Sequence, residues 1–304
     1  MEKLFKLKEH GTDVKTEIIA GITTFLAMAY ILAVNPSYLG GIDGMSAGAV
    51  FSATAISAGI ATLCMAFFAN YPVALASGMG LNAFFAFTVC GAMGYSYKVA
   101  LTAVFIEGII FMLLSLFKFR EALVNKIPSN LKFAITAGIG LFIAIIALLN
   151  ANVVVASEST TVALGELSSP TVVLSLVGLL IIGALQHYKV PGGILLGILI
   201  TWVLGIIAQL VGWYVPNPEA GVYSVIPQFS LSSFEAPKMF QFDFGFIAKN
   251  VPAFILIVFT FLYTDIFDTV GTLIGVAEKG KLLDKDGSLP NATGALMADA
   301  VGTV

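Results

Sequence analysis

Residues 250–277 read NVPAFILIVFTFLYTDIFDTVGTLIGVA, and the only charged residues in this stretch are Asp265 and Asp268, near its middle. At a rise of 1.5 Å per residue, a helix of this length is long enough to cross a hydrocarbon core of about 30 Å. The stretch therefore predicts a membrane-spanning helix that carries two acids at mid-depth.

The composition of the whole chain agrees with a membrane protein. Hydrophobic residues make up 58% of the 304 residues and charged residues 11%, and the mean hydropathy is +0.97. A soluble domain has roughly 45–50% apolar and about 25% charged residues. We expect an all-α polytopic membrane protein of about eight spans, near residues 16–34, 48–69, 73–95, 99–117, 131–149, 171–186, 193–214 and 250–277. The small net charge of −3 indicates no nucleic-acid partner.

The distribution of basic residues predicts how these spans cross the membrane. With the N-terminus (1–15) in the cytoplasm, only Lys98, Lys238 and Lys249 of the 15 basic residues fall outside. The excess of Lys and Arg on one side follows the positive-inside rule. It makes 118–132 a basic inner loop and 150–170 an outer loop, in a multi-pass protein of the cell membrane. The N-terminal segment lacks the pattern of a cleavable signal peptide.

The acidic helix carries a polar stripe. At 100° per residue, Asp265, Asp268, Thr269 and Thr272 lie within an arc of about 100°. Acids at mid-membrane cost roughly 2.5–3.5 kcal/mol on insertion scales and usually serve a function. Two carboxylates one turn apart do not both ionise easily, so the pair is suited to binding and releasing a proton. The alternative is a buried polar patch that holds helices together.

The third span is expected to be broken. Residues 71–94 read YPVALASGMGLNAFFAFTVCGAMG, in which Pro72, Gly78 and Gly80 precede Asn82. The pattern favours an irregular stretch near 73–80 and a half-helix that begins near Asn82. Interrupted spans mark substrate sites in transporters. Ordinary glycine-mediated helix packing explains the same pattern equally well.

The remaining polar residues give weaker signals. Glu107 is an intramembrane acid for which we expect a structural contact with another helix. Cys64 and Cys90 lie in apolar windows and are read as small unpaired hydrophobic residues. The chain has only two His residues, so neither a metal site nor a cofactor is predicted.

Four stretches together resemble a known family: AGITTFLAMAYILAVNP (20–36), ASGMGLNAFFAF (76–87), TDIFDTVGTL (264–273) and ADAVGTV (298–304). They are similar to the adenine/guanine/hypoxanthine permeases, a branch of the nucleobase/ascorbate (nucleobase:cation symporter) superfamily. The four stretches run from the first span to the last residue, so the resemblance covers essentially the whole chain.

The resemblance implies a fold of fourteen spans in two inverted repeats of seven, divided into core and gate domains. Residues 16–117 would form the first-repeat core (spans one to four, span three broken). Residues 118–249 would form the first-repeat gate (spans five to seven) with a long outer loop at 215–247. Residues 250–304 would start the second-repeat core. Because span ten and its acid are missing, the sequence is expected to be a fragment. A homodimer through the gate domain is one arrangement such a fold allows.

The resemblance also assigns roles to residues. Asp268, Asn82, Ala83 and Phe84 would bind substrate, and Asp268, Asp265 and Thr272 would couple transport to protons. Asn82 takes the position that helps to fix purine selectivity. The implied function is proton symport of purine bases such as hypoxanthine, guanine or adenine into the cell by alternating access, with the lipid bilayer as solvent and no enzymatic activity.

Two other classes of protein remain as alternatives. An intramembrane aspartyl protease also needs two acids, but it places them on separate helices and one of them in a Gly-x-Gly-Asp motif that this chain lacks. An anion channel or related transporter is expected to place basic or polar rings along its pore. No predicted span centre here contains Lys or Arg.

Overall fold

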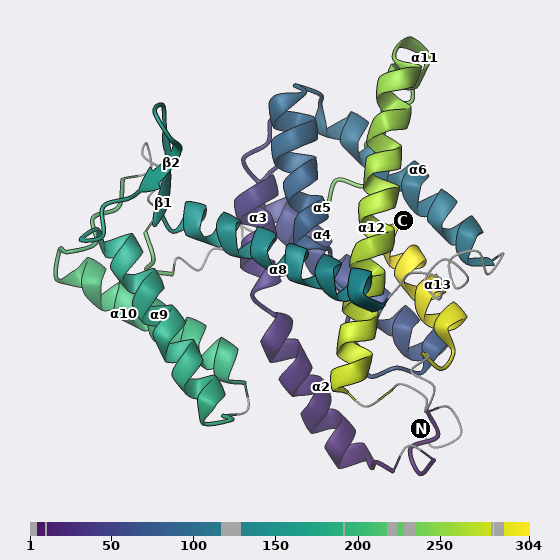
Figure 1. Ribbon diagram of the computed structural model, residues 1–304, viewed down its shortest axis with the longest axis horizontal. Helices are drawn as coiled ribbons and strands as arrows, with labels where there is room; N and C mark the ends of the chain where they lie inside the picture. The colour runs from purple at the N-terminus through teal and green to yellow at the C-terminus, as the bar shows by residue number, and fades with distance from the viewer. Residues whose placement is uncertain are drawn as a thin grey trace. The chain divides into compact units, whose positions relative to one another are not determined.

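The computed structural model describes residues 5–9, 11–116, 129–190, 192–217, 224–227, 235–280, 282 and 289–304. The fold is mostly helical (Figure 1). Contacts divide the chain into two units, each described by itself: 1–14 with 31–141 and 232–304, and 15–30 with 142–231. The predicted inner loop 118–132 lies largely outside the described residues.

The first unit contains the acidic helix. Its elements are α3 (Ile31–Leu39), α4 (Ala47–Cys64), η1 (Met65–Ala69), α5 (Met79–Ala83), η2 (Phe84–Ala92), α6 (Tyr97–Leu116), α11 (Gly245–Lys249), α12 (Val251–Lys279) and α13 (Ala292–Thr303). Helix α12 packs on α6 and α5, and α13 packs on α6, α4 and η1. Helix α8 (Ser129–Asn150) begins in this unit and continues into the second.

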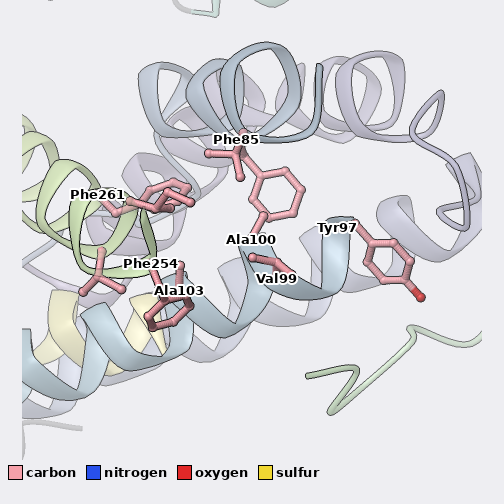
Figure 2. Close-up of a cluster of buried hydrophobic side chains, with 10 residues drawn as sticks. Phe85, Tyr97, Val99, Ala100, Ala103, Phe254 and Phe261 are labelled. Carbon is pink, nitrogen blue, oxygen red and sulfur yellow. The ribbon is translucent and has the colours of Figure 1, made fainter. Parts of the chain in front are cut away.

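The core of the first unit joins η2, α6 and α12. Figure 2 shows Phe85 of η2 and Phe254 and Phe261 of α12 gathered around the small residues Ala100 and Ala103 of α6. Small side chains on α6 let the aromatic rings approach closely, and close packing is a main source of helix association in lipid. The cluster fixes α12 against η2, which follows α5 directly along the chain.

The second unit comprises α2 (Val14–Met28), the C-terminal part of α8, β1 (Val154–Ser157), β2 (Thr161–Leu164), α9 (Pro170–His187) and α10 (Gly193–Leu210). Helices α9 and α10 pack against each other, with Gly178 against Thr201 and Gly197 against Ile182. Strands β1 and β2 pair antiparallel, with Ser157 opposite Thr161. This hairpin was not predicted, because 150–170 was read only as a loop.

Within the described residues, six helices are long and apolar enough to cross a membrane: 14–39, 47–69, 97–116, 170–187, 193–210 and 251–278. They coincide with six of the eight predicted windows. The window 131–149 lies within α8 (Ser129–Asn150), and the third window holds a shorter apolar helix, 79–92. In the third window the reason is plain, since the backbone before residue 79 is not helical.

The interruption of the third window covers residues 70–78, the extended segment. Asn70 adopts a left-handed conformation (φ 58°) that ends η1, and Pro72 disfavours a helical backbone at the residue before it, Tyr71. Leu75 is held by Thr62 of α4, whose Oγ1 accepts from Leu75 N at 3.0 Å and donates to Leu75 O at 3.3 Å. The helix then starts at Met79, three residues before the expected Asn82.

Candidate functional site

The extended segment ends directly against the carboxylate of Asp268. A Cβ atom placed on Gly78 would lie 2.5 Å from Asp268 Oδ2, so only glycine allows this close approach. The Gly78 carbonyl accepts the backbone N–H of Asn82 at 3.0 Å. Asn82 therefore stands one helical turn from the residue that touches the carboxylate. Two of the four predicted substrate-binding residues, Asp268 and Asn82, are thus linked through Gly78.

Asp265 and Thr269 of α12 face α13. Asp265 is 6% exposed and Thr269 5% exposed. Thr269 Oγ1 donates to Asp299 Oδ2 at 2.7 Å, and Thr303 Oγ1 reaches Asp265 Oδ2 at 3.4 Å. Thus the stripe divides between two neighbours: Asp268 meets the extended segment, whereas Asp265 and Thr269 meet α13.

Asn82 belongs to a polar cluster with α3, α4 and the extended segment. Its Nδ2 donates to Asn35 Oδ1 at 2.7 Å and to Ser77 Oγ at 3.2 Å. Asn35, only 3% exposed, donates from its own Nδ2 to Ser77 Oγ at 2.6 Å and to Thr54 Oγ1 at 3.1 Å. Amide and hydroxyl groups thus satisfy one another beside the start of α5.

Three other predicted site residues, Ala83, Phe84 and Thr272, make their contacts outside this polar cluster. Ala83 is buried. Phe84 stacks edge-to-face on Phe261 of α12, with the ring centroids 4.8 Å apart. The hydroxyl of Thr272 donates to the Asp268 carbonyl at 2.7 Å, so it is bonded to the backbone of its own helix and not to the carboxylate.

Two further acids, Glu107 and Asp299, lie on the helices around α12. Glu107 is 1% exposed on α6, the helix that packs on α12 and α13. Asp299 on α13 was not singled out from the sequence, although it lies in the ADAVGTV stretch. Asn35 was interpreted from the sequence only as a residue of the first span that could reach a cavity, and Ser77 and Thr54 were not predicted for the site. Their only signal was a polar residue within an apolar window.

The arrangement suits the binding of a small polar molecule. Within the described residues, no group of three or more His, Cys, Asp or Glu side chains could hold a metal ion. Non-helical backbone beside an acid-bearing helix is the architecture of substrate sites in secondary transporters. Fold and site together define a helical, multi-pass membrane transporter.

Comparison with known proteins identifies the family. The sequence profile of the Permease family matches residues 15–304, and the chain belongs to this family. It is 44% identical to a guanine/hypoxanthine permease of Bacillus subtilis, with 99% of this chain and 67% of the relative covered. It is 42% identical to an adenine permease of Escherichia coli, with 100% and 65% covered. The chain spans about two thirds of the length of these relatives.

Proposed function

We propose that this protein is a proton symporter that imports purine bases across the cell membrane. The observation that carries the proposal is the contact between the Asp268 carboxylate and Gly78, one turn from Asn82. The relatives named as adenine and guanine/hypoxanthine permeases support a purine as substrate. The presence of intramembrane carboxylates favours protons as the coupling ion.

In the proposed mechanism, Asp268 serves both base and proton. A purine carries ring and exocyclic N–H groups, and a carboxylate accepts a charge-assisted hydrogen bond from such a group. Asn82 binds a second polar group of the base, and Ala83 and Phe84 form the apolar wall beside it. Asp265 and Thr272 support Asp268 in holding the proton. Because proton and base share one carboxylate, each changes the affinity for the other by the same factor.

The finer architecture is also part of the proposal. Fourteen spans in two inverted repeats, with 16–117 and 250–304 in the core and 118–249 in the gate, would give alternating access around the site. A homodimer through the gate domain fits this division. The anion-channel alternative lacks basic residues at the predicted span centres, and the family is one of permeases and not of proteases.

The direct test is uptake of labelled hypoxanthine, guanine and adenine. The protein is expressed at its full natural length in bacteria that lack their own purine transporters. We expect accumulation against a gradient that a protonophore abolishes and that removal of Na⁺ leaves unchanged. Accumulation that follows Na⁺ and ignores the protonophore would disprove proton coupling, and absence of purine uptake would disprove the substrate class.

The proposed orientation can be tested at the β1–β2 turn. Ser159 is exposed in this turn, which the basic-residue distribution places outside. In a background with Cys64→Ala and Cys90→Ala, Ser159→Cys should react with a membrane-impermeant thiol reagent on intact cells. Tyr188→Cys, exposed between α9 and α10, should react only after the cells are opened. Reversed labelling would show that the chain crosses the membrane in the opposite orientation.

Replacement of Asn82 should change selectivity. If its amide binds the base, Asn82→Ala removes one hydrogen bond, worth roughly 1–1.5 kcal/mol. We expect the ratio of the inhibition constants of competing purines to shift by about tenfold, with membrane abundance retained. An equal loss for all purines, together with loss of protein from the membrane, would instead indicate a packing role.

A further inference from the structure

The amide of Asn82 has only one orientation compatible with its neighbours. Its Nδ2 carries two hydrogens, and both are used, by Asn35 Oδ1 and by Ser77 Oγ. Among the described residues no donor reaches Asn82 Oδ1. The side chain is half-buried, so this carbonyl is the part of the amide left for a ligand.

Asn35 is the residue that imposes this orientation. Its two Nδ2 hydrogens go to Thr54 and Ser77, and its Oδ1 accepts from Asn82 Nδ2. Ser77 Oγ lies near both amides but has only one hydrogen, so turning both amides round would leave it facing an amide oxygen without a hydrogen between them. Only a donor can face that oxygen, so the NH₂ group of Asn82 must point to Asn35 and its carbonyl away. Asn35 is nearly inaccessible on α3, a helix that packs on both α4 and α5. Its amide is consequently held from two sides.

We infer that Asn35 is a positioning residue for selectivity: it locks the Asn82 amide so that the ligand meets a carbonyl acceptor and never the NH₂ group. The inference rests on the proposed function and adds which partner donates and which accepts in the hydrogen bond between the base and Asn82. A base must present an N–H to Asn82. A ligand with only an acceptor at that position leaves two acceptors facing each other, which a site of this kind rejects strongly.

The competition assay with N-methylated hypoxanthines tests this polarity, since each analogue lacks one N–H. In the parent protein, one analogue should lose affinity far more than the others. Asn35→Leu preserves size but frees the Asn82 amide to rotate, so the discrimination against that analogue should fall by about tenfold. Asn35→Asp keeps an acceptor toward Asn82 and should retain the discrimination of the parent. Ser37→Ala, an exposed change on the same helix, is the matched control.

A double-mutant cycle shows whether Asn35 acts through Asn82. In the Asn82→Ala background, Asn35→Leu should cause no further shift in discrimination. Ser77→Ala gives a second approach at an exposed position: it frees one Asn82 hydrogen and should relax discrimination a few-fold.

The outcomes separate this inference from the proposed function. Unchanged discrimination in both Asn35→Leu and Ser77→Ala, or shifts that add to that of Asn82→Ala, would overturn the role of Asn35 while purine transport stands. If the parent protein takes up no purine, the proposed function itself fails. If Asn82→Ala leaves every ratio unchanged, Asn82 does not bind the base and the role of Asn35 falls with it. If Asn35→Leu does not reach the membrane, Ser77→Ala decides alone: relaxed discrimination supports the role of Asn35, and unchanged discrimination overturns it.

Discussion

Asp268→Asn is expected to abolish proton-driven accumulation of purine. The asparagine has nearly the same size and fits beside Gly78, but it cannot ionise, so it neither carries a proton nor offers a charged acceptor to an N–H of the base. Hydrogen bonds to charged groups contribute about 1.5–3 kcal/mol. Loss of this bond lowers the affinity for the base by roughly 10- to 150-fold, and loss of the proton site removes the driving force altogether.

The measurement is uptake of labelled hypoxanthine at several external pH values, with the protein quantified in the membrane. The parent protein should accumulate more base as the external pH falls, whereas Asp268→Asn should only equilibrate it. Asp268→Glu keeps the ionisable group and should retain part of the activity. Asp43→Asn, an exposed change in the turn before α4, is the matched control and should behave as the parent. Accumulation by Asp268→Asn with the parent's pH dependence would remove Asp268 from the coupling mechanism.

Local sequence patterns were sufficient for the parts of the fold that depend on a single helix. The run around Asp265 and Asp268 predicted a span over 250–277, and α12 covers it from Val251 to Lys279. The break in the third window was also expected, because Pro72 and Gly78 interrupt a helix through their own backbone and need no contact with another helix. Its helix starts earlier than expected, at Met79. No residue before Asn82 signalled this start, since the extended segment is held by Thr62 of another helix.

Contacts between helices could not be predicted from these patterns. The stripe on α12 does not reveal that Asp265 meets Thr303 while Asp268 meets Gly78, because periodicity gives the face of a helix and not its neighbour. For the same reason nothing in the sequence connects Asn35 with Asn82. Its importance comes from Asn82, which lies 47 positions away in sequence.

Gly78→Ala is expected to reduce purine uptake by about 100-fold while leaving the protein folded. The backbone of Gly78 (φ −69°, ψ 130°) is accessible to alanine, so the change introduces no conformational strain. The new methyl group would lie 2.5 Å from Asp268 Oδ2, and the carboxylate must move away. Because that oxygen is at the end of a side chain, the movement costs little stability. A misplacement of about 1 Å in a reacting or binding group can nevertheless cost about 100-fold in rate.

Gly59→Ala provides the matched control for this substitution. Gly59 lies in α4 of the same unit, and a Cβ atom there would meet nothing within 4 Å. Both variants should reach the membrane in amounts similar to the parent, but only Gly78→Ala should lose uptake. The larger Gly78→Val should lose at least as much, because it pushes the carboxylate farther. Uptake by Gly78→Ala at the rate of the parent would show that the position of the Asp268 carboxylate beside the extended segment is not needed for transport.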